Sequence, residues 1–311
     1  MPAEVFGPGY EFLPRKDILD FEEIEKVTRV AVSLGASKIR LTGGEPLLRR
    51  DVAVLVKKLA AIPGVEDLAM TTNGTLLSRL APSLAESGLD RVTVSLDALD
   101  NPTFQAMNGT GAKVERVLDG IQAARTAGLG VKINTVAQKG VNEAELIPLV
   151  RWAIAEELPL RFIEFMDVGE TNGWDVSQVV PYQELVARIE TEVGPTRKVG
   201  RETAAATALT YAVTDQETGK QGEIGFINSV TAPFCQNCSR LRLSADGRAF
   251  TCLFASEGRD LRPLLREGNP NDAEDKLKRA FFAQWSTRHD RYSELRGKVA
   301  QKKAEMSFLG G

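Results

Sequence analysis

Two periods of apolar residues divide the first half of the chain into helices and strands. Apolar positions recur at helical spacing in residues 21–34, 51–61, 76–86, 114–127 and 142–155, which predicts helices there. Short runs rich in β-branched residues predict strands at residues 38–42, 68–72, 92–96, 131–137 and 161–166. Strands and helices alternate with short connections, so we expect a parallel sheet with helices outside it, either an α/β barrel or an open sheet.

The predicted strands alternate apolar and polar residues, although buried parallel strands are usually apolar throughout. Arg40 lies between two apolar residues of the first strand, and Lys132 between two of the fourth. The apolar set must face the helices, so the polar set faces the inner side of the sheet. Enclosed cations need an anion to pair with. The pattern therefore predicts an inner space that holds a large anionic ligand; the alternative is an exposed sheet face with solvated charges.

Composition narrows the possible classes. The chain has 311 residues, of which 43% are hydrophobic, and a net charge of −3, as in ordinary soluble proteins of one large or two medium domains. We expect no nucleic-acid partner and no membrane segment, because the charge is slightly negative and no apolar run is long enough to span a bilayer. There is no Gly-x-Gly-x-x-Gly after a strand and no Walker A sequence.

All three cysteines fall in one short stretch near the end of the chain. Cys235 and Cys238 are two residues apart, and Cys252 follows after a predicted hairpin with a strand at residues 241–244 and a turn at residues 245–248. An odd number of clustered cysteines argues against a disulfide framework and favours a reducing cytoplasm. Structural zinc normally takes four protein ligands, whereas three thiolates suit a 4Fe–4S cluster with one open iron. A three-ligand zinc site and plain buried thiols remain alternatives.

Two arginines follow the Cys-x-x-Cys pair at strand spacing. Arg240 and Arg242 are two residues apart, so a strand would point both side chains to one side. Two fixed cations beside an open iron favour an anionic ligand there, with phosphate as the best candidate.

The motifs taken together resemble one family. The segment Thr42-Gly43-Gly44-Glu45-Pro46 after a strand is similar to the Gly-Gly-Glu-Pro element of radical S-adenosylmethionine enzymes. The wider set resembles the molybdenum cofactor biosynthesis protein A family from Met1 to Gly311. It comprises residues 38–47, Thr71-Thr72-Asn73-Gly74, Val94-Ser95-Leu96-Asp97, residues 161–166, the three cysteines and the final Gly310-Gly311.

The resemblance implies an activity and a fold. Members are GTP 3′,8-cyclases that open molybdenum cofactor biosynthesis: a 5′-deoxyadenosyl radical takes a ribose hydrogen from GTP, and the ribose radical attacks guanine C8. The product is 3′,8-cyclo-7,8-dihydroguanosine 5′-triphosphate, and the next enzyme of the pathway is cyclic pyranopterin monophosphate synthase. The family implies an incomplete (β/α)6 barrel in residues 1–170 and a C-terminal α+β domain in residues 171–311. The oligomeric state stays open between monomer and homodimer.

The resemblance also implies roles for matched residues. Gly44, Ser95 and Met166 match positions that contact S-adenosylmethionine. Cys235, Cys238 and Cys252 match the ligands of a second 4Fe–4S cluster that receives the guanine. Gly310 and Gly311 match a lid over the active site. The positions that match GTP contacts are Arg40, Thr71, Lys132, Arg240, Leu241 and Arg242.

One departure from the family pattern stands beside these matches. The family binds its reducing cluster through Cys-x-x-x-Cys-x-x-Cys after the first strand, and this sequence has no cysteine before Cys235. From the resemblance we expect the natural start to lie upstream, with a first barrel strand and that motif. The 311 residues alone are then not expected to cleave S-adenosylmethionine reductively. The competing interpretations are a non-catalytic remnant that binds iron–sulfur or GTP, and a structural zinc protein.

Overall fold

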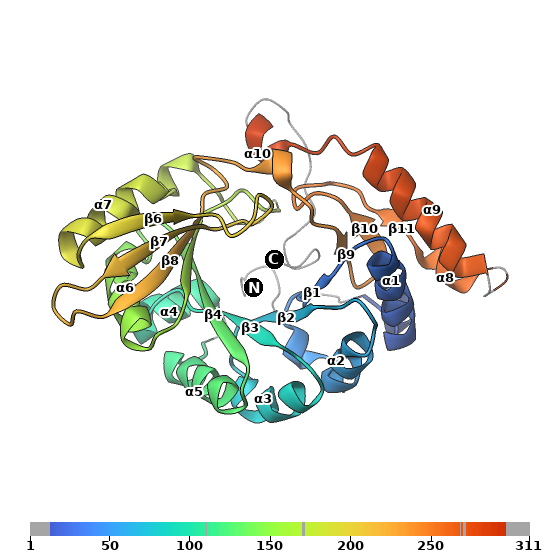
Figure 1. Cartoon of the computed structure of the whole chain (residues 1–311), viewed down its shortest axis with the longest axis horizontal. Coiled ribbons are helices and arrows are strands. Elements are labelled where there is room, and N and C mark those ends of the chain that lie inside the picture. The colour runs from blue at the N-terminus through green and yellow to red at the C-terminus, as the bar shows by residue number, and fades with distance from the viewer. Residues whose placement is uncertain (1–12, 110, 170–171, 268, 270–271, 297–311) are drawn as a thin grey trace.

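A computed structural model describes residues 13–109, 111–169, 172–267, 269 and 272–296. Its main feature is an eight-stranded sheet in the order β1-β2-β3-β4-β5-β8-β7-β6 that curves around a central space (Figure 1). Six strands run parallel: β1 (Lys38–Leu41), β2 (Asp67–Thr72), β3 (Arg91–Ser95), β4 (Gly130–Ala137), β5 (Leu160–Glu164) and β8 (Gln221–Ile227). Antiparallel β7 (Leu209–Thr214) and β6 (Thr196–Gly200) complete it.

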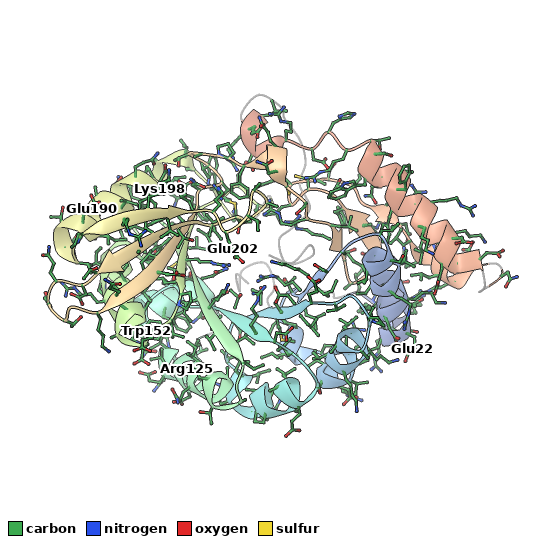
Figure 2. All side chains as sticks on the ribbon, viewed as in Figure 1. Glu22, Arg125, Trp152, Glu190, Lys198 and Glu202 are labelled. Carbon is green, nitrogen blue, oxygen red and sulfur yellow. The ribbon has the colours of Figure 1, made fainter. Side chains whose placement is uncertain are left out.

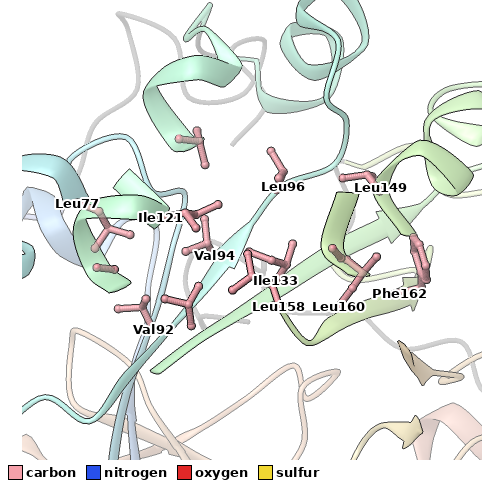
Figure 3. Packing of buried hydrophobic residues seen from close by; sticks show 14 of the residues in the cluster. Leu77, Val92, Val94, Leu96, Ile121, Ile133, Leu149, Leu158, Leu160 and Phe162 are labelled. Carbon is pink, nitrogen blue, oxygen red and sulfur yellow. The ribbon is translucent and has the colours of Figure 1, made fainter. Parts of the chain in front are cut away.

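Helices cover the convex side of this sheet (Figure 1). They are α2 (Val52–Ala60), α3 (Leu77–Glu86), α4 (Asn101–Asn108), α5 (Val114–Thr126), α6 (Leu146–Ala155) and α7 (Tyr182–Glu192). Side chains along a strand alternate between the two faces of the sheet, so every second residue points outward and packs against the apolar face of a helix. Val92 and Val94 of β3 and Ile133 of β4 are thus fully buried against helix residues such as Ile121 and Leu149 (Figure 3).

The five strands and the longer helices predicted from the pattern are confirmed, with ends that shift by a few residues. One expectation was incomplete: the pattern predicted five strands of a parallel sheet, but a sixth strand, β8, pairs with β5 in the same direction. The pattern missed β8 because Gly222, Glu223 and Gly225 interrupt its apolar run. It also follows an antiparallel pair of strands rather than a helix, so it breaks the expected alternation.

A smaller unit follows the main sheet. It contains a three-stranded sheet of β9 (Arg242–Leu243), β10 (Arg248–Phe250) and β11 (Arg259–Asp260), then α8 (Arg262–Arg266), α9 (Ala273–Ser286) and α10 (Tyr292–Leu295). The antiparallel pair β9–β10 confirms the predicted hairpin.

A second hydrophobic core joins this unit to the start of the chain. α1 (Phe21–Ser33) packs on α9, with Val27 and Val30 against Leu277 and Phe281. The main sheet also continues beyond residue 171, so elements from both sides of the predicted 170/171 division share each core. The division into two domains stays a prediction. Within the described residues, no helix has the length and apolarity that crossing a bilayer requires.

Close packing between α3 and α5 depends on one glycine. A Cβ built at Gly120 would lie 2.5 Å from the carbonyl oxygen of Gly74 and 3.0 Å from Cβ of Leu77. Alanine normally stabilises a helix interior by up to about 1 kcal/mol over glycine. Overpacking costs roughly 1–3 kcal/mol, so we expect Gly120→Ala to lower the free energy of unfolding.

The measurement is urea unfolding of Gly120→Ala, with Gln122→Ala as the matched control on the exposed side of the same helix. The control should change the free energy of unfolding by no more than about 0.5 kcal/mol. A stabilised Gly120→Ala variant would mean that α3 and α5 lie further apart than described here.

Candidate functional site

Basic side chains gather on the concave side of the sheet. Arg40 lies on β1, Lys132 on β4 and Arg161 on β5. The strand register carries them to neighbouring positions: Lys132 pairs with Thr93 of β3, and Arg161 with Asn134 of β4. Arg40 and Lys132 therefore lie where the alternation predicted, and Arg161 joins them although the sequence analysis gave it no role of its own.

Arg40 is held by two threonine hydroxyls. Its Nη1 donates to Oγ1 of Thr71 at 2.9 Å and to Oγ1 of Thr93 at 3.2 Å. Enclosure by the curved sheet, followed by repulsion from Arg91 and Arg161, lowers the pKa of Arg40 to about 10. Because this pKa is still well above 7, the guanidinium remains charged at neutral pH. The Arg40 side chain is also accessible to solvent.

Lys132 and Arg161 share this electrostatic environment. Burial and repulsion from neighbouring cations lower the pKa of both groups. Glu202, on the loop between β6 and β7, opposes the shift in both groups, and Figure 2 shows its side chain on the inner side of the ring of strands. No ion pair joins Glu202 to either cation among the contacts of the described residues, so the attraction acts at longer range.

A fourth cation, Arg91, already has a carboxylate. Its Nε and Nη2 donate to Asp67 at 2.8 and 2.6 Å, and burial of Asp67 is outweighed by this partner, so the pKa of Asp67 is lowered. Nη1 of Arg91 is buried without a hydrogen-bond partner. The pair leaves the remaining cations of the concave face in excess, which favours binding of a polyanion.

The residues predicted to contact S-adenosylmethionine share one edge of the sheet. Gly44 follows β1, Ser95 ends β3 and Met166 follows β5, and these strands are parallel. Their carboxyl ends therefore meet at the same edge, where ligands of open parallel sheets usually bind. No described contact tests the predicted roles of these residues.

Glu45 fixes the loop that carries Gly44. Its carboxylate accepts from Leu47 N at 3.0 Å, from Thr72 Oγ1 at 2.7 Å and from Asn73 N at 2.8 Å. The loop between β1 and the short 3₁₀ helix Pro46–Leu48 is thereby tied to the end of β2. The sequence motif alone did not predict this role of Glu45, because the two partners on β2 and after it lie 27 and 28 residues further along the chain.

Asp97 lies at the same edge, two residues after Ser95. Burial raises the pKa of Asp97 to about 6, although its carboxylate accepts from the backbone N–H of Val136 at 2.8 Å. Asp97 therefore titrates within the physiological range, unlike an exposed aspartate.

The cysteines lie outside the main sheet, in the segment between β8 and β11. Cys235 is the first residue of the 3₁₀ helix Cys235–Asn237, Cys238 follows this helix, and Cys252 follows β10. Burial opposes the thiolate of Cys238, but the charge of Arg240 and the surrounding donors outweigh it and lower the pKa of that thiol. Burial raises the pKa of Cys252, against a hydrogen bond from Phe254 N at 3.4 Å.

Arginines surround the cysteine loop. Arg240 donates from Nε and Nη2 to Sγ of Cys238 at 3.2 and 2.9 Å, and Arg288 donates to the carbonyl oxygen of Cys238. Arg242 is half-buried, and its buried Nη1 has no hydrogen-bond partner. Burial and repulsion from Arg240 and Arg288 lower the pKa of Arg242, which the nearby thiols partly offset. Leu241 between them is 37% exposed.

The three cysteines are free and are compatible with the ligand set of an iron–sulfur cluster. Within the described residues, no three His, Cys, Asp or Glu side chains converge closely enough to enclose one metal ion. A cluster distributes its thiolates over separate iron atoms, so they need not converge on a point. Three cysteines, one with a lowered thiol pKa and cationic neighbours, suit a negatively charged cluster. The predicted lid residues Gly310 and Gly311 lie outside the described residues.

Comparison with known proteins identifies relatives of both halves. The radical SAM superfamily profile matches residues 6–153, and the Molybdenum Cofactor Synthesis C profile matches residues 158–294. Curated proteins named GTP 3′,8-cyclase are 46% identical in Xanthomonas axonopodis pv. citri, 43% in Acidothermus cellulolyticus and 41% in Staphylococcus aureus. Each alignment covers 100% of this chain and 91% of the relative.

Solved structures agree on the fold. Streptococcus suis SuiB bound to S-adenosylmethionine superposes with a TM-score of 0.56 at 15% identity, over 88% of this chain and 60% of that one. A second structure of Streptococcus suis SuiB gives a TM-score of 0.54 at 16% identity over the same shares. This chain thus matches less than two thirds of SuiB, and at such identity the likeness concerns the fold alone.

The raised pKa of Asp97 predicts a pH-dependent stability. The folded chain holds this proton more tightly than the unfolded chain, whose aspartate titrates near 3.8, so the contribution of Asp97 to stability is lost as pH rises through about 6. Asp97→Asn keeps an oxygen for Val136 N but carries no charge. We therefore expect the difference in free energy of unfolding between this variant and wild type to increase by roughly 1–2 kcal/mol, in favour of the variant, from pH 5 to pH 8.

Urea unfolding across that pH range measures the difference. Asp100→Asn is the control, because a hydrogen bond from Thr103 N lowers the pKa of Asp100 and its titration lies below the range. The Asp100→Asn difference from wild type should stay constant with pH. A constant Asp97→Asn difference as well would show that Asp97 is already charged at pH 5.

Proposed function

This chain belongs to the GTP 3′,8-cyclase family of radical S-adenosylmethionine enzymes, and we propose that it converts GTP to 3′,8-cyclo-7,8-dihydroguanosine 5′-triphosphate on the concave side of its sheet. The observation that carries the proposal is the excess of cations there, namely Arg40, Lys132 and Arg161. Glu202 acts on Lys132 and Arg161, and Asp67, which already pairs with Arg91, acts on Arg40 and Lys132. A triphosphate has the charge and the length to bridge such a group.

We assign the phosphates to these three cations and the base to the cysteine side. Arg40 is oriented by Thr71 and Thr93, so its guanidinium presents a fixed set of donors. Arg242 has a buried, unpaired Nη1 beside the cysteines, and a nucleotide acceptor there would satisfy it. Thr71, Arg240 and Leu241 complete the set of proposed GTP contacts by family resemblance.

We assign S-adenosylmethionine to the carboxyl edge of the sheet. Gly44, Ser95 and Met166 would contact it, and Glu45 would keep the glycine loop in place. When bound, this cofactor and its reducing cluster would supply the radical that opens the reaction. Cys235, Cys238 and Cys252 would hold the second cluster, whose open iron would be available to the base. The protein's own task is to hold the ribose of GTP between these two ends.

The remaining proposals concern context. The cyclised nucleotide would pass to cyclic pyranopterin monophosphate synthase by the order of the pathway. Three free cysteines and an iron–sulfur cluster suit a reducing cytoplasm. A homodimer remains one of the possible assemblies.

Turnover is the direct experiment. The chain, joined at its N-terminus to a relative's Cys-x-x-x-Cys-x-x-Cys segment, would be reconstituted with iron and sulfide and given GTP, S-adenosylmethionine and dithionite. We expect 5′-deoxyadenosine and the cyclised nucleotide in equal amounts. Reductive cleavage without any nucleotide product would assign the chain to another radical reaction.

The cysteine assignment predicts one 4Fe–4S cluster per 311-residue chain. Anaerobic reconstitution should give about four iron and four sulfide per chain. Cys→Ala at position 235, 238 or 252 should abolish stable incorporation, because two thiolates hold a cluster poorly. Iron, sulfide and zinc analysis measures the result, and stoichiometric zinc without iron uptake would favour the structural zinc interpretation.

The phosphate assignment predicts GTP affinities for the cation variants. Charge-assisted hydrogen bonds contribute roughly 1.5–3 kcal/mol each, so replacing one cation by alanine should weaken GTP binding about ten- to a hundredfold. Equilibrium binding to the cluster-free chain measures this without turnover. The variants are Arg40→Ala, Lys132→Ala, Arg161→Ala, Arg240→Ala and Arg242→Ala.

Two controls frame that series. Arg125 pairs with Glu156 at 3.1 Å on the outer surface (Figure 2), so Arg125→Ala should leave GTP affinity unchanged. Glu202→Gln removes the carboxylate that attracts Lys132 and Arg161, so it should strengthen binding. Equal affinity across the whole series, with folding intact, would place GTP elsewhere.

A further inference from the structure

Arg240 has a defined orientation in spite of its long side chain. It directs two donors at one sulfur, Cys238 Sγ, as described above. Arginine loses much rotamer freedom when it is fixed in this way, so other contacts must stabilise the orientation. The question is which residues supply them.

The ring of Phe234 is the first such contact. The guanidinium carbon of Arg240 lies 5.2 Å from the centre of this ring, within the range of a cation–π interaction. Phe234 immediately precedes the 3₁₀ helix that carries the cysteine pair, so ring and sulfur belong to the same short segment.

A second guanidinium, that of Arg201, approaches the same ring. Its central carbon lies 4.8 Å from the centre of the Phe234 ring. Two like charges near one another repel, and the electron-rich ring face compensates each of them. Arg201 therefore determines where the ring can lie.

Arg201 is itself locked to the main sheet. Its Nη1 donates to the carbonyl oxygens of Ala206, at 3.0 Å, and Thr207, and its Nη2 donates to Oδ1 of Asn228 at 2.9 Å. Asn228 follows β8 and is 2% exposed, so this acceptor is rigidly held. A continuous series of contacts thus runs from the end of β8 to the cysteine loop.

We propose that Arg201 and Phe234 are positioning residues that hold the Arg240 guanidinium against the sulfur of Cys238. This inference rests on the proposed function only for its consequence, namely that a fixed Arg240 binds nucleotide better than a mobile one. The placement of Arg240 is a property of the chain without any ligand.

The decisive experiment observes the Arg240 side chain directly. In the cluster-free chain labelled at arginine, the Nε–H resonance of Arg240 is assigned by its loss in Arg240→Lys. Wild type should show slow hydrogen exchange and restricted guanidinium rotation at this signal. Phe234→Leu removes the aromatic face, and Arg201→Lys removes the planar fork with its three hydrogen bonds, so both should give a fast-exchanging, averaged signal.

Matched variants show whether the effect is specific. Phe234→Tyr retains the aromatic face and should keep the wild-type signal. Phe282→Leu makes the same chemical change at a residue that is 72% exposed on α9, and it should leave Arg240 unaffected. An unchanged Arg240 signal in both Phe234→Leu and Arg201→Lys overturns the inference, as does equal loss of the signal in Phe234→Tyr.

GTP binding by the same variants tests the consequence separately. Phe234→Leu and Arg201→Lys should weaken binding about three- to thirtyfold, since a cation–π contact is lost, and Phe234→Tyr should not. If the Arg240 signal is released and GTP affinity stays at the wild-type value, the positioning role stands and the assignment of Arg240 to GTP fails.

Discussion

Repulsion between the cations of the concave face constrains the rest of the structure. Burial, followed by repulsion from Arg91 or Arg161, lowers the pKa of Arg40, Lys132 and Arg161. Among the described residues, Arg91 is the one of these four cations with a carboxylate in salt-bridge contact. A sheet can carry such a face because period two separates it from the apolar face, which builds the core with the helices. The convex side thus supplies the stability that the concave side reduces, and an anionic ligand removes the cost.

The sequence predicted the part of this arrangement that depends on local pattern. The alternation of polar and apolar residues predicts that Arg40 and Lys132 point inward, because their apolar neighbours in the strand must face the helices. Arg161 obeys the same rule, but its strand was considered as a family motif and not as part of the inward series. β8 was missed because two glycines weaken its apolar pattern. In addition, the two strands that precede it in the chain, β6 and β7, form an antiparallel pair, which breaks the alternation of strand and helix. Strand pairing is a tertiary property, so residue spacing alone could not reveal this addition to the sheet.

Loop residues were predicted less well than strand residues, and for a physical reason. Glu45 acts through donors at Thr72 and Asn73, and Glu202 through charges on two distant strands. Neither carboxylate stands in a periodic pattern that would predict its direction. The three cysteines were predicted from their spacing. The orientation of Arg240, which donates to Cys238, depends in our proposal on Arg201, which lies in the loop between β6 and β7.

Arg201 and Glu202 are adjacent in the chain, and they act on two different parts of the site, the cysteine loop and the cations of the concave face. Arg201 faces the Phe234 ring and the cysteine loop, whereas the next residue faces Lys132 and Arg161. One loop, held at its two ends by β6 and β7 and internally by the bonds from Arg201 to Ala206 and Thr207, therefore borders both places. Because the loop is fixed to its own sheet, the separation between the cysteines and the phosphate cations is set by the fold. A ligand that reaches both places must span that separation and carry negative charge toward Lys132 and Arg161, which a nucleoside triphosphate can do.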